Sequence, residues 1–317
     1  MTAAGRGGPR VRTVFLGSGG FGSETLRRLD GHDDVRVVGV VTAPPRPAGR
    51  KQGLTTSVIH GVADGLGVNT ILTPGRLRAP ESIAAVLALD PELLVLADYG
   101  QIVPTALLEL PFGALNLHPS LLPRHRGATP IPAAILSGDT ETGVTLLRMD
   151  AGLDTGPIVV QERVTLDGIE TAPRLEQNLK LVAAGLLDRS LGPWIRGELE
   201  PRPQPDDGAT ITRPLRREDG RLDAARRAVD LWRQVRAYEP WPGSFVETAD
   251  GRLAIWRSSV EPTTDQPPGQ FGPRGLATAD GELLLHEVQP AGGKRMPWEA
   301  YVRGRPGIVG SAVIPGS

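Results

Sequence analysis

The chain has 317 residues, a formal net charge of −1 and no cysteine. Without cysteine, disulfide bonds, thiolate zinc sites and a cysteine nucleophile are excluded, and the near-neutral charge excludes a surface coated in positive charge. Because no run of 18 apolar residues occurs, we expect no membrane-spanning helix, and we expect a cytoplasmic monomer with a flexible tail at residues 1–10 followed by two domains.

The first part of the chain alternates between predicted strands and predicted helices. Apolar runs predict buried strands at residues 11–16, 35–41, 69–72 and 93–97, and the spacing of apolar residues predicts helices at 23–29, 56–66 and 80–89. This alternation is typical of an α/β fold with a doubly wound, mostly parallel, Rossmann-like sheet. Functional groups of such sheets gather at the carboxyl ends of the strands.

A glycine-rich turn, Gly17-Ser-Gly-Gly-Phe-Gly22, follows the first predicted strand. Its G-x-G-x-x-G spacing, between a strand and a helix, is the pattern of a dinucleotide-binding turn. The next strand, however, ends in Thr42-Ala-Pro-Pro and offers no acidic residue for a ribose hydroxyl. We therefore expect a plain strand-to-helix turn and no NAD, although a nicotinamide oxidoreductase stays open as an alternative that rests on this turn alone.

The segment from Ala43 to Leu54 is a long, basic loop with several proline and glycine residues. It carries Arg46, Arg50 and Lys51. One interpretation is a solvated insertion. The other is a loop whose cations meet phosphates and which becomes ordered on contact with them.

A short strand at residues 115–118 carries two polar side chains on one face. Leu115 and Leu117 alternate with Asn116 and His118, and Pro119 ends the strand. Asn116 and His118 therefore project from the same side, roughly 7 Å apart. An amide that donates and an imidazole that exchanges a proton suit a carbonyl carbon that becomes tetrahedral. The simpler alternative is a buried asparagine and histidine that satisfy each other.

A carboxylate that could complete this pair lies in the tight loop Met149-Asp-Ala-Gly-Leu-Asp-Thr-Gly156. This loop connects predicted strands at 144–149 and 157–164, which we expect to form a hairpin. A carboxylate beside an imidazole favours the imidazolium, so we interpret Asp154 as the third catalytic residue. Taken alone, the same loop could be an ordinary turn.

The second part of the chain predicts a smaller domain rich in short strands. A helix at 172–191 is expected to complete a catalytic domain at residues 11–197, and the Pro-, Asp- and Gly-rich stretch 198–210 predicts a linker. Residues 211–317 are expected to contain a helix at 219–238, strands near 244–247, 252–258, 275–278 and 283–288, and a final helix at 298–304. Short strands at this spacing favour a β-barrel of the OB-like type.

Several of these motifs together resemble those of the 10-formyltetrahydrofolate-dependent formyltransferase family. The matching residues are Asn116-Leu-His118-Pro-Ser-Leu-Leu-Pro123, Arg126-Gly127, Gly143-Val-Thr145, Met149 to Gly156, Arg46-Pro-Ala-Gly-Arg50 and Arg236-Ala-Tyr-Glu-Pro-Trp-Pro-Gly243. The first four motifs are shared across the family, and the last two point to members that act on tRNA. In this family, proline and an acidic residue stand where this chain has Gly19 and Gly20.

The resemblance implies transfer of a formyl group from 10-formyltetrahydrofolate to the α-amine of methionine on initiator tRNA. It implies Asn116, His118 and Asp154 as catalytic residues, and folate contacts from Tyr99, Gly100, Ser120, Leu121, Leu122 and Pro123. It implies tRNA contacts from Arg46, Arg50 and Lys51. No cluster of metal-binding residues is visible in the sequence, so we expect no metal. A formyltransferase acting on a sugar or nucleotide amine is the main alternative, and a non-catalytic RNA-binding module is another.

Overall fold

The structure, a computed structural model, describes residues 10–48 and 53–314. The chain divides into two compact units, which are described separately. Unit 1 contains residues up to Pro130 together with Glu141–Thr165 and Glu176–Thr212, and unit 2 contains Ile131–Thr140, Leu166–Leu175 and the chain from Arg213 onward. Two short inner segments therefore belong to the same unit as the C-terminal third.

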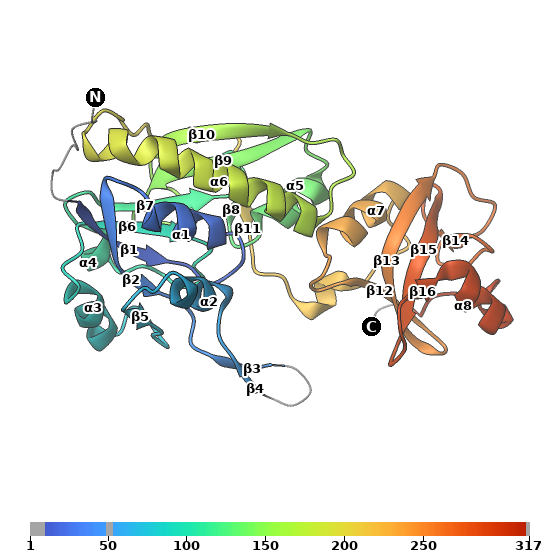
Figure 1. Ribbon diagram of the computed structural model, residues 1–317. Coiled ribbons are helices and arrows are strands. Elements are labelled where there is room, and N and C mark those ends of the chain that lie inside the picture. The colour runs from blue at the N-terminus through green and yellow to red at the C-terminus, as the bar shows by residue number, and fades with distance from the viewer. Residues whose placement is uncertain (1–9, 49–52, 315–317) are drawn as a thin grey trace, which may run out of the picture. The chain divides into compact units, whose positions relative to one another are not determined.

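Unit 1 is built on a seven-stranded sheet (Figure 1). Its strands are β1 Val11–Leu16, β2 Val35–Val41, β5 Ile71–Leu72, β6 Leu93–Ala97, β7 Ala114–His118, β9 Glu141–Arg148 and β10 Ile158–Thr165. Their order is β10-β9-β7-β6-β1-β2-β5. Neighbouring strands from β5 to β7 pair in parallel. Strand β9 pairs antiparallel with both of its neighbours, β7 and β10. The predicted Rossmann-like sheet is confirmed, and so is the predicted hairpin at 144–149 and 157–164.

Helices cover both faces of this sheet because its central strands are apolar on both sides. They are α1 Ser23–Asp30, α2 Val58–Gly65, α3 Pro80–Leu87, α4 Thr105–Leu108 and most of α6 Ala172–Ile195. Every residue of β6 is buried, and one core cluster joins Val14, Leu94 and Leu96 of the strands to Val86 of α3 and Leu107 of α4. In Figure 1, α1 and α6 run across the other face. Burial on both faces explains why these strands have no polar alternation.

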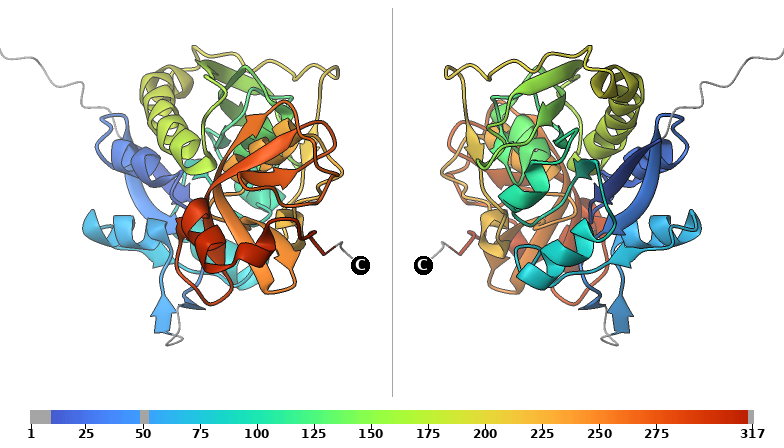
Figure 2. Two further views of the ribbon diagram at one scale, coloured as in Figure 1. Left: turned by 90° about the vertical axis from the view of Figure 1, so that its right-hand side faces the viewer. Right: turned by 90° about the vertical axis from the view of Figure 1, so that its left-hand side faces the viewer.

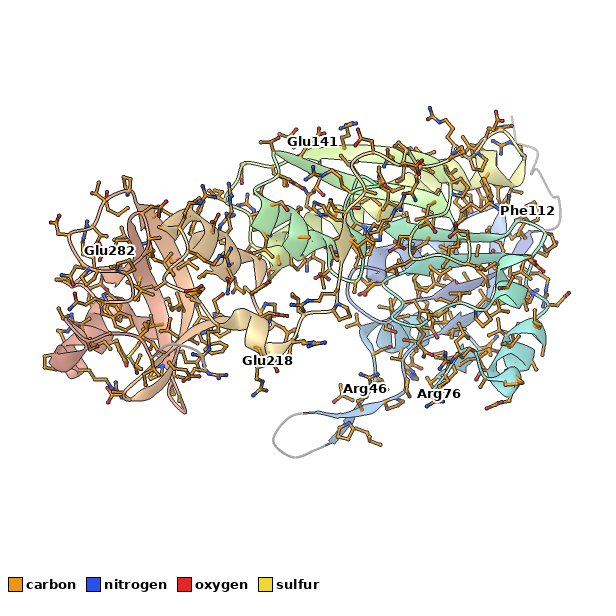
Figure 3. All side chains as sticks on the ribbon, turned by 180° about the vertical axis from the view of Figure 1, so that it is seen from behind. Arg46, Arg76, Phe112, Glu141, Glu218 and Glu282 are labelled. Atoms are coloured by element: carbon orange, nitrogen blue, oxygen red, sulfur yellow. The ribbon has the colours of Figure 1, made fainter. Side chains whose placement is uncertain are left out.

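The described residues of the basic segment 43–55 include two short paired strands. Strands β3 Arg46–Ala48 and β4 Gly53–Thr55 pair antiparallel, with Arg46 opposite Thr55. The labelled Arg46 in Figure 3 lies on this hairpin, which projects away from the sheet. The sequence alone did not reveal this pairing, since it involves only three residues per strand among proline and glycine residues.

The stretch expected to be a linker is hydrogen-bonded into unit 1. Directly after it, β11 Ile211–Thr212 pairs in parallel with β8 Arg126–Gly127. Further back, the amide and carbonyl groups of Arg202 bond with those of Ile158 at the start of β10. This stretch is therefore part of the framework of unit 1, not only a connection.

Unit 2 contains α5 Pro130–Ser137 for most of its length and an antiparallel sheet that curls, as the orange and red strands in Figure 2 show. The strands are β12 Ser244–Thr248, β13 Gly251–Glu261, β14 Gly275–Ala277, β15 Glu282–Pro290 and β16 Met296–Pro297, in the order β12-β13-β15-β14 with β16 on β15. Its core includes the stacked rings of Phe271, Trp298 and Tyr301, and α8 Trp298–Gly304 has the predicted bounds. The predicted small β domain is confirmed.

The helix expected at 219–238 is shorter in the structure. A 3₁₀ turn spans Arg217–Gly220, and α7 begins only at Ala228 and ends at Ala237. Between them, the Leu222 amide donates to the Phe245 carbonyl, and Asp223 accepts the Ala225 amide in a local turn. These competing hydrogen bonds hold the preceding residues out of the helix.

Within the described residues, no helix has both the length and the apolar composition needed to cross a membrane.

Candidate active site

Strand β7 presents Asn116 and His118 at its carboxyl end. It lies between β6, which pairs with it in parallel, and β9, which pairs with it antiparallel, so that Asn116 faces Leu96 and Leu147 across the ladders. His118 is opposite Thr145 and is only 4% exposed, whereas Asn116 is half-buried. Pairing on both sides gives these two side chains fixed backbone positions.

The loop between β9 and β10 brings Asp154 to the same place. Its Oδ1 accepts a hydrogen bond from Asn116 Nδ2 at 3.2 Å, and its Oδ2 lies 3.6 Å from His118 Nδ1. Oδ2 also accepts from the Gly127 amide at 2.8 Å. The three side chains expected to be catalytic therefore meet around one carboxylate, although they come from segments nearly 40 residues apart in the chain.

The contact of His118 with a backbone carbonyl shows which of its ring nitrogens carries a hydrogen. Its Nε2 lies 2.8 Å from the carbonyl oxygen of His125. A carbonyl only accepts, so Nε2 carries a hydrogen. This leaves Nδ1, the nitrogen that faces Asp154, to hold or release the second proton.

Three non-glycine residues near this edge have left-handed backbone conformations. They are Asp98 with φ +57°, His125 with φ +56° and Asp154 with φ +52°. Such conformations are uncommon outside glycine and persist only where the surrounding structure supports them. In His125 and Asp154 the unusual backbone places the groups that contact His118.

The arrangement provides the parts needed for acyl transfer between nitrogen atoms. Asn116 uses one amide hydrogen on Asp154 and keeps a second for a substrate oxygen. The Asp154 carboxylate lies beside His118 Nδ1, and a hydrogen on Nδ1 is the one that His118 can donate to an oxyanion, because Nε2 is already bonded to the His125 carbonyl. No nucleophilic side chain has to react covalently for this chemistry.

In the segment that follows β7, residues 119–124, the buried side chains stabilise the backbone of the segment itself. Ser120 is fully buried and its hydroxyl donates to the Arg124 carbonyl at 2.6 Å, while Leu122 is 3% exposed. Leu121 and Pro123 are half-buried. Of the four residues expected to contact folate here, only these two offer accessible side-chain surface.

The turn after β6 contains the other two expected folate residues. The Tyr99 ring packs against the core cluster of unit 1, and burial raises the pKa of its hydroxyl to about 12. Gly100 is exposed, with open space where a side chain would stand. Ile102 on this turn and Leu153 on the Asp154 loop are 76% and 58% exposed. Each segment therefore offers an exposed apolar side chain.

Asp98 fills the space beside the glycine-rich turn 17–22. A Cβ at residue 19 would overlap with Asp98 Oδ2, and a Cβ at residue 20 would lie 3.0 Å from Glu176 Oε1. Two carboxylates therefore lie against the backbone that a dinucleotide turn offers to a pyrophosphate. Like charges repel, so this geometry argues against NAD binding despite the glycine spacing.

The pKa of Asp98 leads to a prediction about stability. Reduced hydration, together with the negative charge of Glu176, raises this pKa from 3.8 to about 6. The folded state thus holds a proton that the unfolded state has lost between about pH 4 and 6, and the free energy of unfolding falls as pH rises through this window. The Asp98 side chain is also partly exposed, and solvent screens its charge. We therefore expect Asp98→Asn to raise the free energy of unfolding by only about 1 kcal/mol at pH 7.5 and by almost nothing at pH 4.

Urea unfolding of Asp98→Asn and of the parent chain at both pH values measures this difference. An equal gain at pH 4 and pH 7.5 would show that the effect does not come from ionisation of Asp98.

The basic residues expected to contact tRNA are only partly described. Arg46 is exposed on the β3–β4 hairpin. Arg50 and Lys51 lie outside the described residues.

Three residues of this region were given no role from the sequence. Thr145 accepts from the Leu122 amide and donates to the Ser120 carbonyl, and Gln161 donates to the Leu122 carbonyl. Gln204 contacts the Asp154 loop from the expected linker. The Gly143-Val-Thr145 motif could have indicated Thr145, but a lone glutamine among prolines carries no such signal.

In the part of the chain that is described, no group of three His, Asp or Glu side chains is placed to hold a metal ion.

Comparison with known families matches both units of the chain. Residues 11–190 match the model of the formyl transferase family, and residues 214–306 match the formyl transferase C-terminal domain. Together these segments cover most of the chain.

Individual relatives give the same result. The chain is 41% identical to methionyl-tRNA formyltransferase of Roseiflexus sp. over 302 residues, which are 93% of this chain and 92% of that protein. It is 39% identical to methionyl-tRNA formyltransferase of Symbiobacterium thermophilum, with 96% of each chain covered. Among solved structures, the N-formyltransferase of Helicobacter canadensis in complex with folinic acid and dTDP-3-aminofucose has a TM-score of 0.64 at 16% identity and covers 90% of this chain and all of that one. At 16% identity, the similarity to this solved structure shows a shared fold only.

Proposed function

The chain belongs to the formyl transferase family, and we propose that it transfers the formyl group of 10-formyltetrahydrofolate to the α-amine of methionine on initiator tRNA. The observation that carries this proposal is the meeting of Asn116, His118 and Asp154 at the end of β7. Relatives that share about 40% of their residues along almost the whole chain are methionyl-tRNA formyltransferases, which supports methionyl-tRNA as the acceptor. The solved structure with a nucleotide-sugar ligand is far more distant in sequence.

In the proposed mechanism the neutral α-amine attacks the formyl carbon. A bond forms between nitrogen and carbon, and the formyl oxygen becomes an oxyanion that accepts hydrogen bonds from Asn116 Nδ2 and from Nδ1 of protonated His118, because Nε2 is already bonded to the His125 carbonyl. The bond from this carbon to N10 then breaks, and the proton lost by the amine is delivered to N10. Asp154 keeps His118 charged and helps an ordered water to carry that proton. A covalent enzyme intermediate is not needed, which agrees with a chain without cysteine.

Folate is proposed to lie between the turn at 97–104 and the loop at 149–156. The exposed side chains of Ile102 and Leu153 suit the faces of a flat ring system, and exposed Gly100 allows close approach to the backbone. Leu121 and Pro123 supply further accessible surface, while Ser120, Leu122 and Tyr99 support the backbone around them. What the folate supplies is the activated formyl group.

The acceptor is proposed to contact the basic segment 43–55 through Arg46, Arg50 and Lys51. Cations can bind phosphates, which dominate affinity for nucleic acids. We expect Arg50→Ala to raise KM for charged initiator tRNA by about tenfold, with folate binding unchanged. Steady-state kinetics with each substrate varied in turn measures both effects.

The exposed Arg28 on α1 provides a matched control for loss of one positive charge. Arg28→Ala is expected to keep the KM of the parent enzyme for tRNA. A similar rise in both variants would mean that net charge, and not the hairpin, governs tRNA binding.

Transfer of labelled formyl from 10-formyltetrahydrofolate to methionyl initiator tRNA tests the proposed function directly. Methionyl elongator tRNA and a nucleotide-linked amino sugar serve as alternative acceptors. We expect efficient transfer to initiator tRNA alone. Preferential transfer to the amino sugar would instead identify the chain as a sugar N-formyltransferase.

A further inference from the structure

One glutamine in the stretch 198–212 joins the two loops that surround Asp154. Gln204 Nε2 donates to the backbone carbonyl oxygens of Asp154 and Gly156, both at 2.7 Å. Its Oε1 accepts from Nε and Nη2 of Arg126 at 3.0 and 2.7 Å. Gln204 is half-buried, whereas Arg202, Pro203, Pro205 and Asp206 around it are exposed. In an otherwise exposed stretch, Gln204 therefore points inward and uses both Oε1 and Nε2 in hydrogen bonds.

We propose that Gln204 is a positioning residue for formyl transfer, which holds the Asp154 loop so that its carboxylate stays beside Asn116 and His118. The inference rests on the proposed function, because it concerns the same site. Gln204 does not itself reach the side chains of that trio: its donors meet backbone oxygens, and it acts through Asp154.

The backbone of Asp154 explains why such support is needed. Asp154 has φ +52°, a conformation that costs free energy for a residue with a side chain. The hydrogen bonds to the carbonyls of residues 154 and 156 hold the backbone that directly follows this conformation. Without them, the loop could relax toward an ordinary conformation, and the carboxylate would move with it.

Gln204 also connects this loop to the donor on the opposite side of the carboxylate. Its partner Arg126 precedes Gly127, whose amide donates to Asp154 Oδ2. The neighbouring backbone is supported by β11, since the Arg126 amide donates to the Thr210 carbonyl. One side chain thus ties the backbone that carries Asp154 to the segment that fixes its Oδ2.

Two substitutions separate the parts of this contact. Gln204→Met keeps the length of the side chain but removes all four hydrogen bonds. Gln204→Glu keeps an acceptor for Arg126 but cannot donate to the carbonyls of Asp154 and Gly156. Arg202→Ala is the matched control, because this exposed residue of the same stretch contacts Ile158 through its backbone.

We expect kcat to fall by about tenfold to a hundredfold in both Gln204 variants, since small displacements of a catalytic group have effects of this size. KM for charged tRNA should stay within about twofold of the parent value, and Arg202→Ala should be unchanged. A merely structural role would change the melting temperature and KM for tRNA instead. Retention of kcat in Gln204→Glu alone would assign the effect to Arg126 and overturn the role of the two donors.

A double-mutant cycle with Asp154→Asn tests whether Gln204 acts through Asp154. In that background, Gln204→Met should lower kcat no more than about twofold further, because the interaction is already lost. A full multiplicative loss would overturn the inference. Hydrogen exchange provides a readout without turnover: the Gly127 amide, a donor to Asp154, should exchange faster in Gln204→Met. If the parent chain transferred no formyl group, the proposed function would fail, whereas unchanged exchange at Gly127 would refute the positioning role by itself.

Discussion

Asp154→Asn is expected to lower kcat for formyl transfer by about 10²–10³-fold, with little effect on folding. Asparagine has the size of aspartate and can still accept from the Gly127 amide, so the loop should keep its conformation. What it lacks is the negative charge 3.6 Å from His118 Nδ1. Without that charge, the imidazolium proposed to stabilise the oxyanion loses its partner. Single-turnover formyl transfer and a thermal melt measure the two effects separately.

Asp150 offers a control within the same loop. Its carboxylate accepts from the Gly152 amide and the Thr155 hydroxyl and is exposed. Asp150→Asn removes the same charge at a position without contact to His118, and should cost less than about tenfold in kcat. Equal losses in the two variants would mean that general loop charge, not the contact with His118, explains the effect.

Asn116→Ala is expected to have an effect of similar size on kcat, again about 10²–10³-fold. Asn116 is the neutral donor of the site, and alanine removes both the hydrogen bond to Asp154 and the amide hydrogen proposed for the oxyanion. Because the backbone of Asn116 is paired on both sides, the strand itself should remain in place. KM for folate is expected to change little, since the interaction forms mainly in the transition state.

Asn116→Asp extends this test. The variant keeps the volume and the ability to accept, but it has no donor and places a second carboxylate beside Asp154. It should be at least as impaired as Asn116→Ala. Near-normal turnover in either variant would remove Asn116 from the mechanism.

Much of the unit 1 sheet could be predicted from apolar runs. Strands β1, β2 and β6 have the predicted bounds because strands buried on both faces leave a continuous apolar signal in the sequence. The β3–β4 hairpin and the late start of α7 could not be predicted in the same way. Both depend on contacts between residues, such as the Leu222 amide on the Phe245 carbonyl, that local composition does not reveal.

The candidate site was accessible to sequence reasoning only in part. The alternation at residues 115–118 and the short loop ending at Gly156 indicated which polar side chains would lie at the end of a strand. The supporting contacts were not visible, because Thr145, Gln161 and Gln204 bind backbone groups and leave no distinctive spacing. The carboxylate of Asp98 beside Gly19 was also hidden, although it explains why a glycine-rich turn does not imply a dinucleotide.

The pairing of β8 with β11 has a practical consequence for protein engineering. A fragment that ends where the composition changes, near residue 197, would lack Gln204, Thr210 and Thr212, which bond to the loops at 123–129 and 154–156. Chimeras that exchange the C-terminal third between relatives should therefore join the two sequences after Thr212. A fusion point placed earlier would replace residues that bond to the loops around Asp154 with those of another protein.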